Sequence, residues 1–147
     1  MGVSAGAHLR SLERLRCGQA SPAEDGREQK QKMPTLNIYT NVPVDSVVAS
    51  DILKDATKAV AKIVAKPESY VMILLNGAVP IAFAGSEEPA AYGELTSIGG
   101  LGPSVNGKLS STIADILQTK LSIDGSRFYI KFYDVQRSYF GFNGSTF

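Results

Sequence analysis

The pattern of apolar and polar residues switches several times between the period of a strand and that of a helix after residue 33. In the first run, PTLNIYTNVP, Leu36, Ile38 and Thr40 share one face and Pro43 ends the strand. A nearly continuous apolar run such as SYVMILLNG is typical of a strand covered on both faces. The segments with strand character are residues 34–43, 69–77, 80–85, 91–100 and 126–135.

Two further segments carry apolar residues at helical spacing. The first is Ile52, Ala56, Ala59, Val60 and Ile63, and the second is Leu109, Ile113, Ile116 and Leu117. Asp45 and Ser46 are suitable caps for the first helix. We expect that helix to end before Pro67, because a residue that precedes proline avoids the helical region.

This order, a strand, a helix and a strand repeated twice, predicts an α+β fold in which a mixed four-stranded sheet carries both helices on one face. The other face is left bare. Residues 70–75 and 128–133 are too apolar for a solvated face, so we expect another copy of the chain to cover it. The aromatic tail, residues 139–147, is a candidate for an additional short edge strand.

Composition excludes several classes of function. The chain has 147 residues and a formal charge of +1, with dispersed lysines and no basic stripe for nucleic acid. No apolar run is long enough to cross a membrane. The single cysteine, Cys17, and the single histidine, His8, both precede the expected domain. We therefore expect no disulfide, no metal site and no catalytic histidine in it.

Residues 1–32 differ from the rest in having few aliphatic and no aromatic residues. We expect a disordered or artefactual N-terminal extension, with residues 33–147 as the domain. A transit peptide is the alternative, because Arg10, Arg14 and Arg16 lie among alanines and serines, although later acidic residues weaken it. We expect a cytoplasmic protein, with organelle targeting by the extension or secretion without a signal peptide as the alternatives.

Several stretches together resemble the macrophage migration inhibitory factor and D-dopachrome tautomerase family, most of all its plant members. They are MPTLNIYTNVP, KPESYVMILL, AFAGSEEPAAYGELTSIGGLG, RFYIKFYD and FGFNGSTF, in this order from Met33 to Phe147. The resemblance implies a β-α-β-β-α-β fold and a homotrimer that encloses a central channel. It also implies cofactor-independent keto-enol tautomerase activity on phenylpyruvate-like or dopachrome-like substrates, with sites at the subunit interfaces.

The resemblance assigns a role to each candidate site residue. Pro34 matches the catalytic base, and Lys66 matches the lysine that pairs with the substrate carboxylate. Ile98, with Ser97 beside it, matches a position whose backbone holds a substrate oxygen. Read alone, Pro34 marks the start of a strand and Lys66 suits the end of a helix.

The remaining pocket residues are implied in the same way. Tyr129 matches a tyrosine from the neighbouring subunit, and Phe140, Phe142 and Phe147 belong to the aromatic tail that closes the pocket. This tail could instead simply seal the edge of the sheet. Two positions depart from the mammalian cytokine: Lys131 replaces an asparagine that binds substrate, and Phe142 replaces a tryptophan. Lys131 could strengthen carboxylate binding, fill the pocket, or select a more acidic substrate.

The chemistry depends on where the chain starts. A terminal Pro34 is a basic secondary amine, whereas an internal proline nitrogen is an amide without a basic lone pair. The sequence therefore supports two functions: a tautomerase that acts on a small aromatic keto acid when Pro34 is terminal, or a non-catalytic, cytokine-like trimer that binds a receptor or another protein. The cytokine's Cys-x-x-Cys is replaced by residues 90–93, AAYG, so we expect no thiol oxidoreductase activity.

Overall fold

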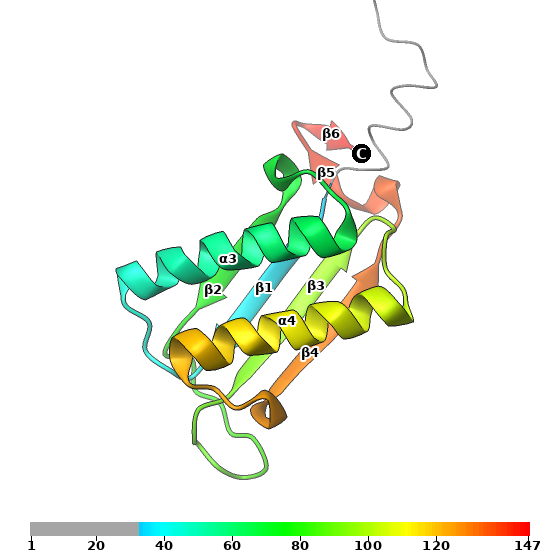
Figure 1. Ribbon diagram of the computed structural model, residues 1–147. Helices are drawn as coiled ribbons and strands as arrows, with labels where there is room; N and C mark the ends of the chain where they lie inside the picture. Colours follow the sequence, from blue (N-terminus) through cyan, green and yellow to red (C-terminus); the bar gives the residue numbers. More distant parts are fainter. Residues whose placement is uncertain (1–32) are drawn as a thin grey trace, which may run out of the picture. The chain divides into compact units, whose positions relative to one another are not determined.

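The computed structural model describes residues 33–147, and the expectations for residues 1–32 lie outside this part of the chain. Four strands and two long helices build the fold (Figure 1). Their bounds are β1 (Thr35–Thr40), α3 (Ser46–Val64), β2 (Met72–Asn76), β3 (Ala91–Ser97), α4 (Pro103–Leu121) and β4 (Phe128–Asp134). Within residues 33–147 no helix is long and apolar enough to span a membrane.

The four strands form one mixed sheet in the order β2-β1-β3-β4. β1 pairs with β2 in parallel and with β3 antiparallel, and β3 pairs with β4 in parallel. Figure 1 shows α3 and α4 side by side on the same face of this sheet. The β-α-β-β-α-β order and the one-sided helix layer predicted from the sequence are confirmed.

Helix α3 begins where Asp45 caps it, because the Asp45 carboxylate accepts hydrogen bonds from Val47 N at 3.0 Å and Val48 N at 2.9 Å. It ends at Ala65, whose φ of 57° turns the chain out of the helix before Lys66. The expected apolar stripe is largely confirmed. Of the five expected positions, Ile52, Ala56 and Val60 are buried, while Ala59 and Ile63 are half-buried. Ala61 and Val64, which were not expected, are buried as well.

The core lies between the sheet and the helices. Its fully buried side chains include Leu36, Ile38, Ile52, Val60, Leu95, Leu109, Ile113, Leu117 and Ile123. On β1 every second residue is buried, and the same holds for β3, as expected for strands with one face toward a core. This packing fixes the register of the central strands, since a slip of one residue would expose Leu36 and Leu95 to solvent.

The face of the sheet opposite α3 and α4, the open face, carries no helix of the described residues (Figure 1). The edge strands contribute exposed apolar side chains to it, with Met72 59% and Tyr129 66% exposed. The central strands contribute polar ones, and Asn37 accepts a hydrogen bond from Asn76 Nδ2 at 2.8 Å. The open face is thus more polar than the sequences of β2 and β4 suggest.

Two segments differ from the sequence-based expectation. Residues 80–85 are not a strand of the sheet, since Phe83 makes only an isolated bridge to Ser86. The aromatic tail does not extend the sheet edge either. It forms its own hairpin of β5 (Gly141–Phe142) and β6 (Ser145–Thr146). The turn residues Asn143 and Gly144, both with positive φ, favour such a local two-residue hairpin.

Candidate active site

β1 starts at the end of the sheet where β3 and β4 finish (Figure 1), and Pro34 comes directly before its first residue. The antiparallel register pairs Thr35 with Thr96, so that Pro34 lies opposite Ser97. Its carbonyl accepts a hydrogen bond from Met72 N at 3.0 Å. Pro34 is fully buried in this chain, which contains residues on both sides of it.

The turn after β3 is held in a defined shape beside Pro34. Ser97 Oγ donates a hydrogen bond to Gly99 O at 2.6 Å, and Gly99 N donates one to Asp134 Oδ1 at 3.0 Å. Gly100 has a φ of 77°, and a Cβ there would lie 3.1 Å from a Val64 methyl group. Gly100 therefore allows the turn to pack closely against the end of α3.

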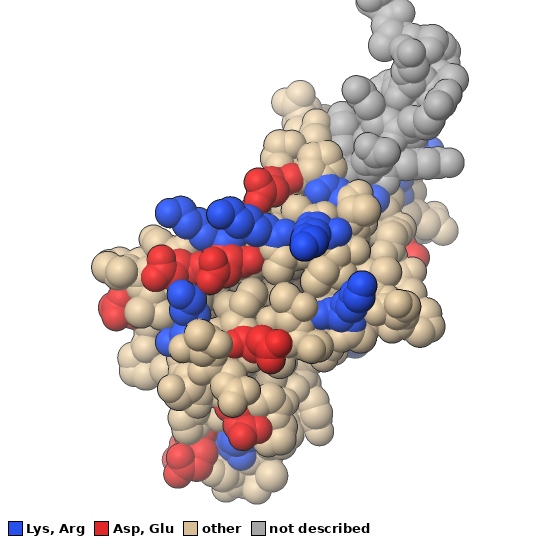
Figure 2. Space-filling model, viewed as in Figure 1, with Lys and Arg blue, Asp and Glu red and all other residues tan. Residues whose placement is uncertain are grey.

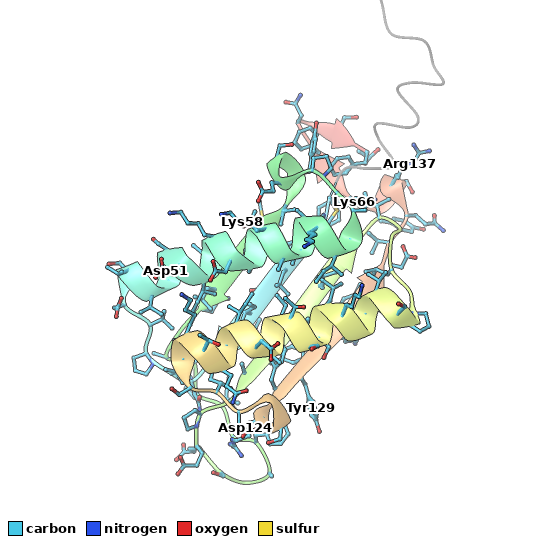
Figure 3. All side chains as sticks on the ribbon, in the orientation of Figure 1. Asp51, Lys58, Lys66, Asp124, Tyr129 and Arg137 are labelled. Carbon is cyan, nitrogen blue, oxygen red and sulfur yellow. The ribbon has the colours of Figure 1, made fainter. Side chains whose placement is uncertain are left out.

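Lys66 brings a positive charge to this turn. Its Nζ donates a hydrogen bond to Ile98 O at 3.3 Å, and Figure 3 shows the side chain at the end of α3 nearest the tail. Partial burial lowers the pKa of Lys66 below its usual value, and the negative charge of Asp134 offsets part of that decrease. Pro34, Lys66, Ser97 and Ile98 thus lie at the same end of the sheet within a single chain.

The aromatic tail lies at the same end of the sheet. Phe142 stacks on Phe147 with ring centroids 5.2 Å apart, and Phe140 lies 6.2 Å from Phe147. Tyr70 contacts Phe142 edge to face, with ring centroids 5.6 Å apart. Tyr70 comes two residues before Met72, whose backbone N–H donates to Pro34 O. These rings form an aromatic wall at the end of the sheet where Pro34 lies (Figure 1).

Tyr129 and Lys131 do not lie at this end of the sheet. In β4, Asp134 pairs with Ser97, whereas Tyr129 pairs with Tyr92. At about 3.3 Å per residue, the five-residue separation places Tyr129 about 16 Å from the Asp134 position along the strand. Lys131 lies between them on the open face, 4.8 Å above the Tyr133 ring, and its contact with the Tyr133 hydroxyl raises the pKa of Lys131.

Sequence reasoning missed Asp134 as a member of this constellation. It is the last residue of β4 and the one that pairs with Ser97, so it holds the turn and influences Lys66. The signal was available in principle, because a carboxylate at the end of a strand beside β3 falls next to the glycine turn. Recognising it required the register of β3 and β4, which the sequence pattern alone does not give.

A groove of about 500 Å³ lies elsewhere, on the outer side of α3. Its lining residues are Ser50, Leu53, Lys54, Thr57, Lys58 and Glu68. Figure 2 shows lysine or arginine side chains along this part of the surface, with acidic side chains beside them. The groove contains none of the expected site residues, and its mixed charge is that of an ordinary solvated helix face.

Comparisons with known protein sequences cover the whole described part of the chain. A family model described as macrophage migration inhibitory factor (MIF) matches residues 33–147. A macrophage migration inhibitory factor homolog of Brugia malayi is 45% identical over 115 residues, which span 78% of this chain and 99% of the relative. The macrophage migration inhibitory factor of Xenopus laevis is 39% identical over 115 residues, with 78% and 99% covered.

Solved structures agree with these sequence matches. A macrophage migration inhibitory factor homologue from Prochlorococcus marinus superposes with a TM-score of 0.74 at 37% identity, covering 77% of this chain and 98% of that one. Macrophage migration inhibitory factor of Toxoplasma gondii superposes with a TM-score of 0.75 at 31% identity, covering 77% and 99%. In each case almost the entire comparison protein corresponds to the domain after residue 32 of this chain.

Proposed function

Because this chain belongs to the macrophage migration inhibitory factor family, we propose that it is a cofactor-independent keto-enol tautomerase whose general base is the nitrogen of a terminal Pro34. The substrate is a small aromatic keto acid of the phenylpyruvate or dopachrome type. The observation that carries the proposal is that Pro34, Lys66 and the Ile98 turn lie at the same end of the sheet as an aromatic wall.

The proton transfer needs a free amine. A terminal α-amino group has a reference pKa of about 8, and burial together with the nearby Lys66 charge would lower it toward neutrality. The neutral amine then takes a proton from the carbon next to the substrate carbonyl and returns one to oxygen, or the reverse. Lys66 holds the carboxylate, the Ile98 backbone orients the substrate oxygen, and the tail rings cover the aromatic group.

The backbone around Met33 supports a chain start at Pro34. Met33 has a φ of 79°, in the left-handed region that residues with a side chain rarely adopt, at a cost of about 1–2 kcal/mol. A chain that starts at Pro34 does not carry this strain. Initiation at Met33 followed by removal of the methionine, which the small next residue permits, would produce that chain.

We also propose that the active form is a homotrimer. Tyr129 lies about 16 Å along β4 from the end of the sheet where Pro34 lies, and Lys131 lies on the open face against the Tyr133 ring. A neighbouring copy could supply both, and it would cover the exposed apolar residues of the open face at the same time. Lys131 would add a second positive charge near the substrate carboxylate and favour binding of the anion.

The test compares two proteins, one starting at Pro34 and one carrying residues 1–33 as well. The relatives consist almost entirely of the matched 115 residues, so the shorter chain is expected to fold alone. We expect phenylpyruvate and dopachrome methyl ester turnover only from the shorter protein, and loss of about 100-fold or more in kcat with Pro34→Gly. Absence of turnover from a correctly folded trimer that starts at Pro34 would contradict the proposal.

The alternative is a non-catalytic trimeric signalling or interaction protein that binds a receptor or another protein partner. One observation favours it: in the 147-residue chain the Pro34 nitrogen is in a peptide bond, and both Met33 and Pro34 are buried. Intact-mass measurement of the protein isolated from its own cells separates the two functions. A mass equal to that of residues 34–147 supports the enzyme, and a mass equal to that of residues 1–147 supports the binding protein.

A further inference from the structure

Tyr129 is 66% exposed, yet its ring has a fixed neighbour. The Phe83 ring lies 5.0 Å from it with an interplanar angle of 60°, a favourable tilted arrangement. Phe83 belongs to the connection between β2 and β3, residues 77–90, and Tyr129 lies at the start of β4, where Figure 3 labels it. An exposed tyrosine is therefore supported by a loop rather than by the core.

Arg127, two residues before Tyr129, holds this loop through several backbone carbonyls. Its Nε donates to Pro89 O at 2.9 Å, and its Nη2 donates to Ser86 O and Glu88 O, both at 3.1 Å. The guanidinium also lies 5.3 Å from the centre of the Phe83 ring. A guanidinium fork can make all of these contacts at once, whereas a lysine ammonium cannot reproduce their geometry.

Asn41, directly after β1, makes further contacts with the same loop. Asn41 donates to Glu88 O at 3.0 Å and accepts a hydrogen bond from Ala90 N at 2.9 Å. Ala84 and Gly85 both have positive φ and form a tight turn that reverses the chain next to Phe83. None of residues 77–89 is buried, so these contacts add little to the hydrophobic core. Their principal effect is to fix where Phe83 lies.

We propose that Arg127 and Phe83 are positioning residues that hold Tyr129 in the orientation required to complete the active site of a neighbouring copy. This rests on the proposed function. A freely rotating Tyr129 would lose side-chain entropy each time substrate bound, and a ring held in advance by Phe83 avoids that loss. Arg127 acts one step further away, because it fixes the loop and stacks on Phe83.

A double-mutant cycle on the protein that starts at Pro34 tests the proposal. Phe83→Leu removes the ring contact, and we expect KM for phenylpyruvate to rise about two- to tenfold while kcat changes little. In a Tyr129→Ala background the same substitution is expected to change KM no further, because Phe83 acts only through Tyr129. The conservative variant Phe83→Tyr keeps the ring and should retain the original KM.

Arg127→Lys provides the second arm. It keeps the positive charge but cannot make the several guanidinium hydrogen bonds to the loop. We therefore expect faster hydrogen exchange in the loop and an increase in KM, as for Phe83→Leu. As with Phe83→Leu, this increase should vanish in the Tyr129→Ala background. Independent, additive effects of Phe83→Leu and Tyr129→Ala, or an unchanged KM in Phe83→Leu, would overturn the proposal.

A spectroscopic readout separates failure of this proposal from failure of the proposed function. In protein labelled with 3-fluorotyrosine, the Tyr129 resonance is assigned by its loss in Tyr129→Phe. Phe83→Leu should shift that resonance toward the value of a freely rotating tyrosine and leave the other five tyrosine signals in place. An unchanged Tyr129 signal refutes the positioning role even if the protein has no tautomerase activity. A shifted signal without turnover refutes only the enzyme.

Discussion

Asp134 is the residue whose charge most directly affects Lys66, the expected carboxylate anchor. Two roles can be separated at this position, because Asp134 accepts the hydrogen bond of Gly99 N at 3.0 Å and also raises the pKa of Lys66 through its charge. Asparagine retains an acceptor oxygen but not the charge. Alanine removes both.

For Asp134→Asn we expect the upper pH limit of substrate binding to move to lower pH. Burial already lowers the pKa of Lys66, and without the carboxylate the pKa decreases further, so Lys66 loses its proton at a lower pH. The measurement is KM for phenylpyruvate as a function of pH. Asp115→Asn, an exposed carboxylate on α4, is the control and should leave the profile in place. An unchanged upper limit in Asp134→Asn would contradict this account.

Among the helices and strands, the sequence predicts a segment well when the residues that determine its structure are near to it in the chain. The two helices follow from local spacing and from Asp45, whose carboxylate caps α3 as the sequence suggested. Residues 80–85 look like a strand because Ile81 and Phe83 alternate with small residues. They do not form one, because Ala84 and Gly85 turn the chain with positive φ, and Arg127 and Asn41 bind backbone carbonyls of the loop. The contacts of these distant residues are not visible in any local pattern.

Some residues of the candidate site could be predicted from the sequence and others could not. Pro34, Lys66 and the turn at Ile98 are placed together by chain topology, and the family resemblance identified them. Tyr129 was expected from a neighbouring copy and Lys131 only as a replacement for a substrate-binding asparagine. Their positions in β4, opposite Tyr92 and Glu94, are away from the end of the sheet where Pro34 lies, and both roles stay predictions. Phe83 and Arg127 were not found, because their connection to Tyr129 runs through side-chain contacts between segments about 40 residues apart.

The cap of α3 gives a stability prediction at this scale. Asp45→Ala removes the acceptor for Val47 N and Val48 N, and we expect the free energy of unfolding to fall by about 1 kcal/mol. Asp45→Asn is the matched control, since its side-chain oxygen can still accept both bonds, and it should lose much less. Urea unfolding should show a lower midpoint with an unchanged slope for Asp45→Ala. Equal losses in both variants would mean that the hydrogen bonds are not responsible.

For the whole molecule, the distribution of residues over the open sheet face indicates how copies would meet. The centre of the face is polar and partly satisfied within the chain, since Tyr92 donates to Glu94 at 3.0 Å and Asn76 donates to Asn37. The edge strands carry the exposed apolar residues, including Met72 and Tyr129. Contacts between copies are therefore expected along the edges, with the polar centre left hydrated around a channel.

Leu74, on the open face of the edge strand β2 and 39% exposed, provides the test of this assembly. Leu74→Lys would bury an unpaired charge if a second copy covers this strand, and the cost of several kcal/mol should dissociate the proposed trimer. Val47→Lys makes the same chemical change on α3, where the side chain is 71% exposed, and should leave the trimer intact. Sedimentation equilibrium of the protein starting at Pro34 distinguishes monomer from trimer. If Leu74→Lys remained trimeric, the copies would have to meet elsewhere, and Tyr129 could not be assigned to a neighbour's site on this geometry.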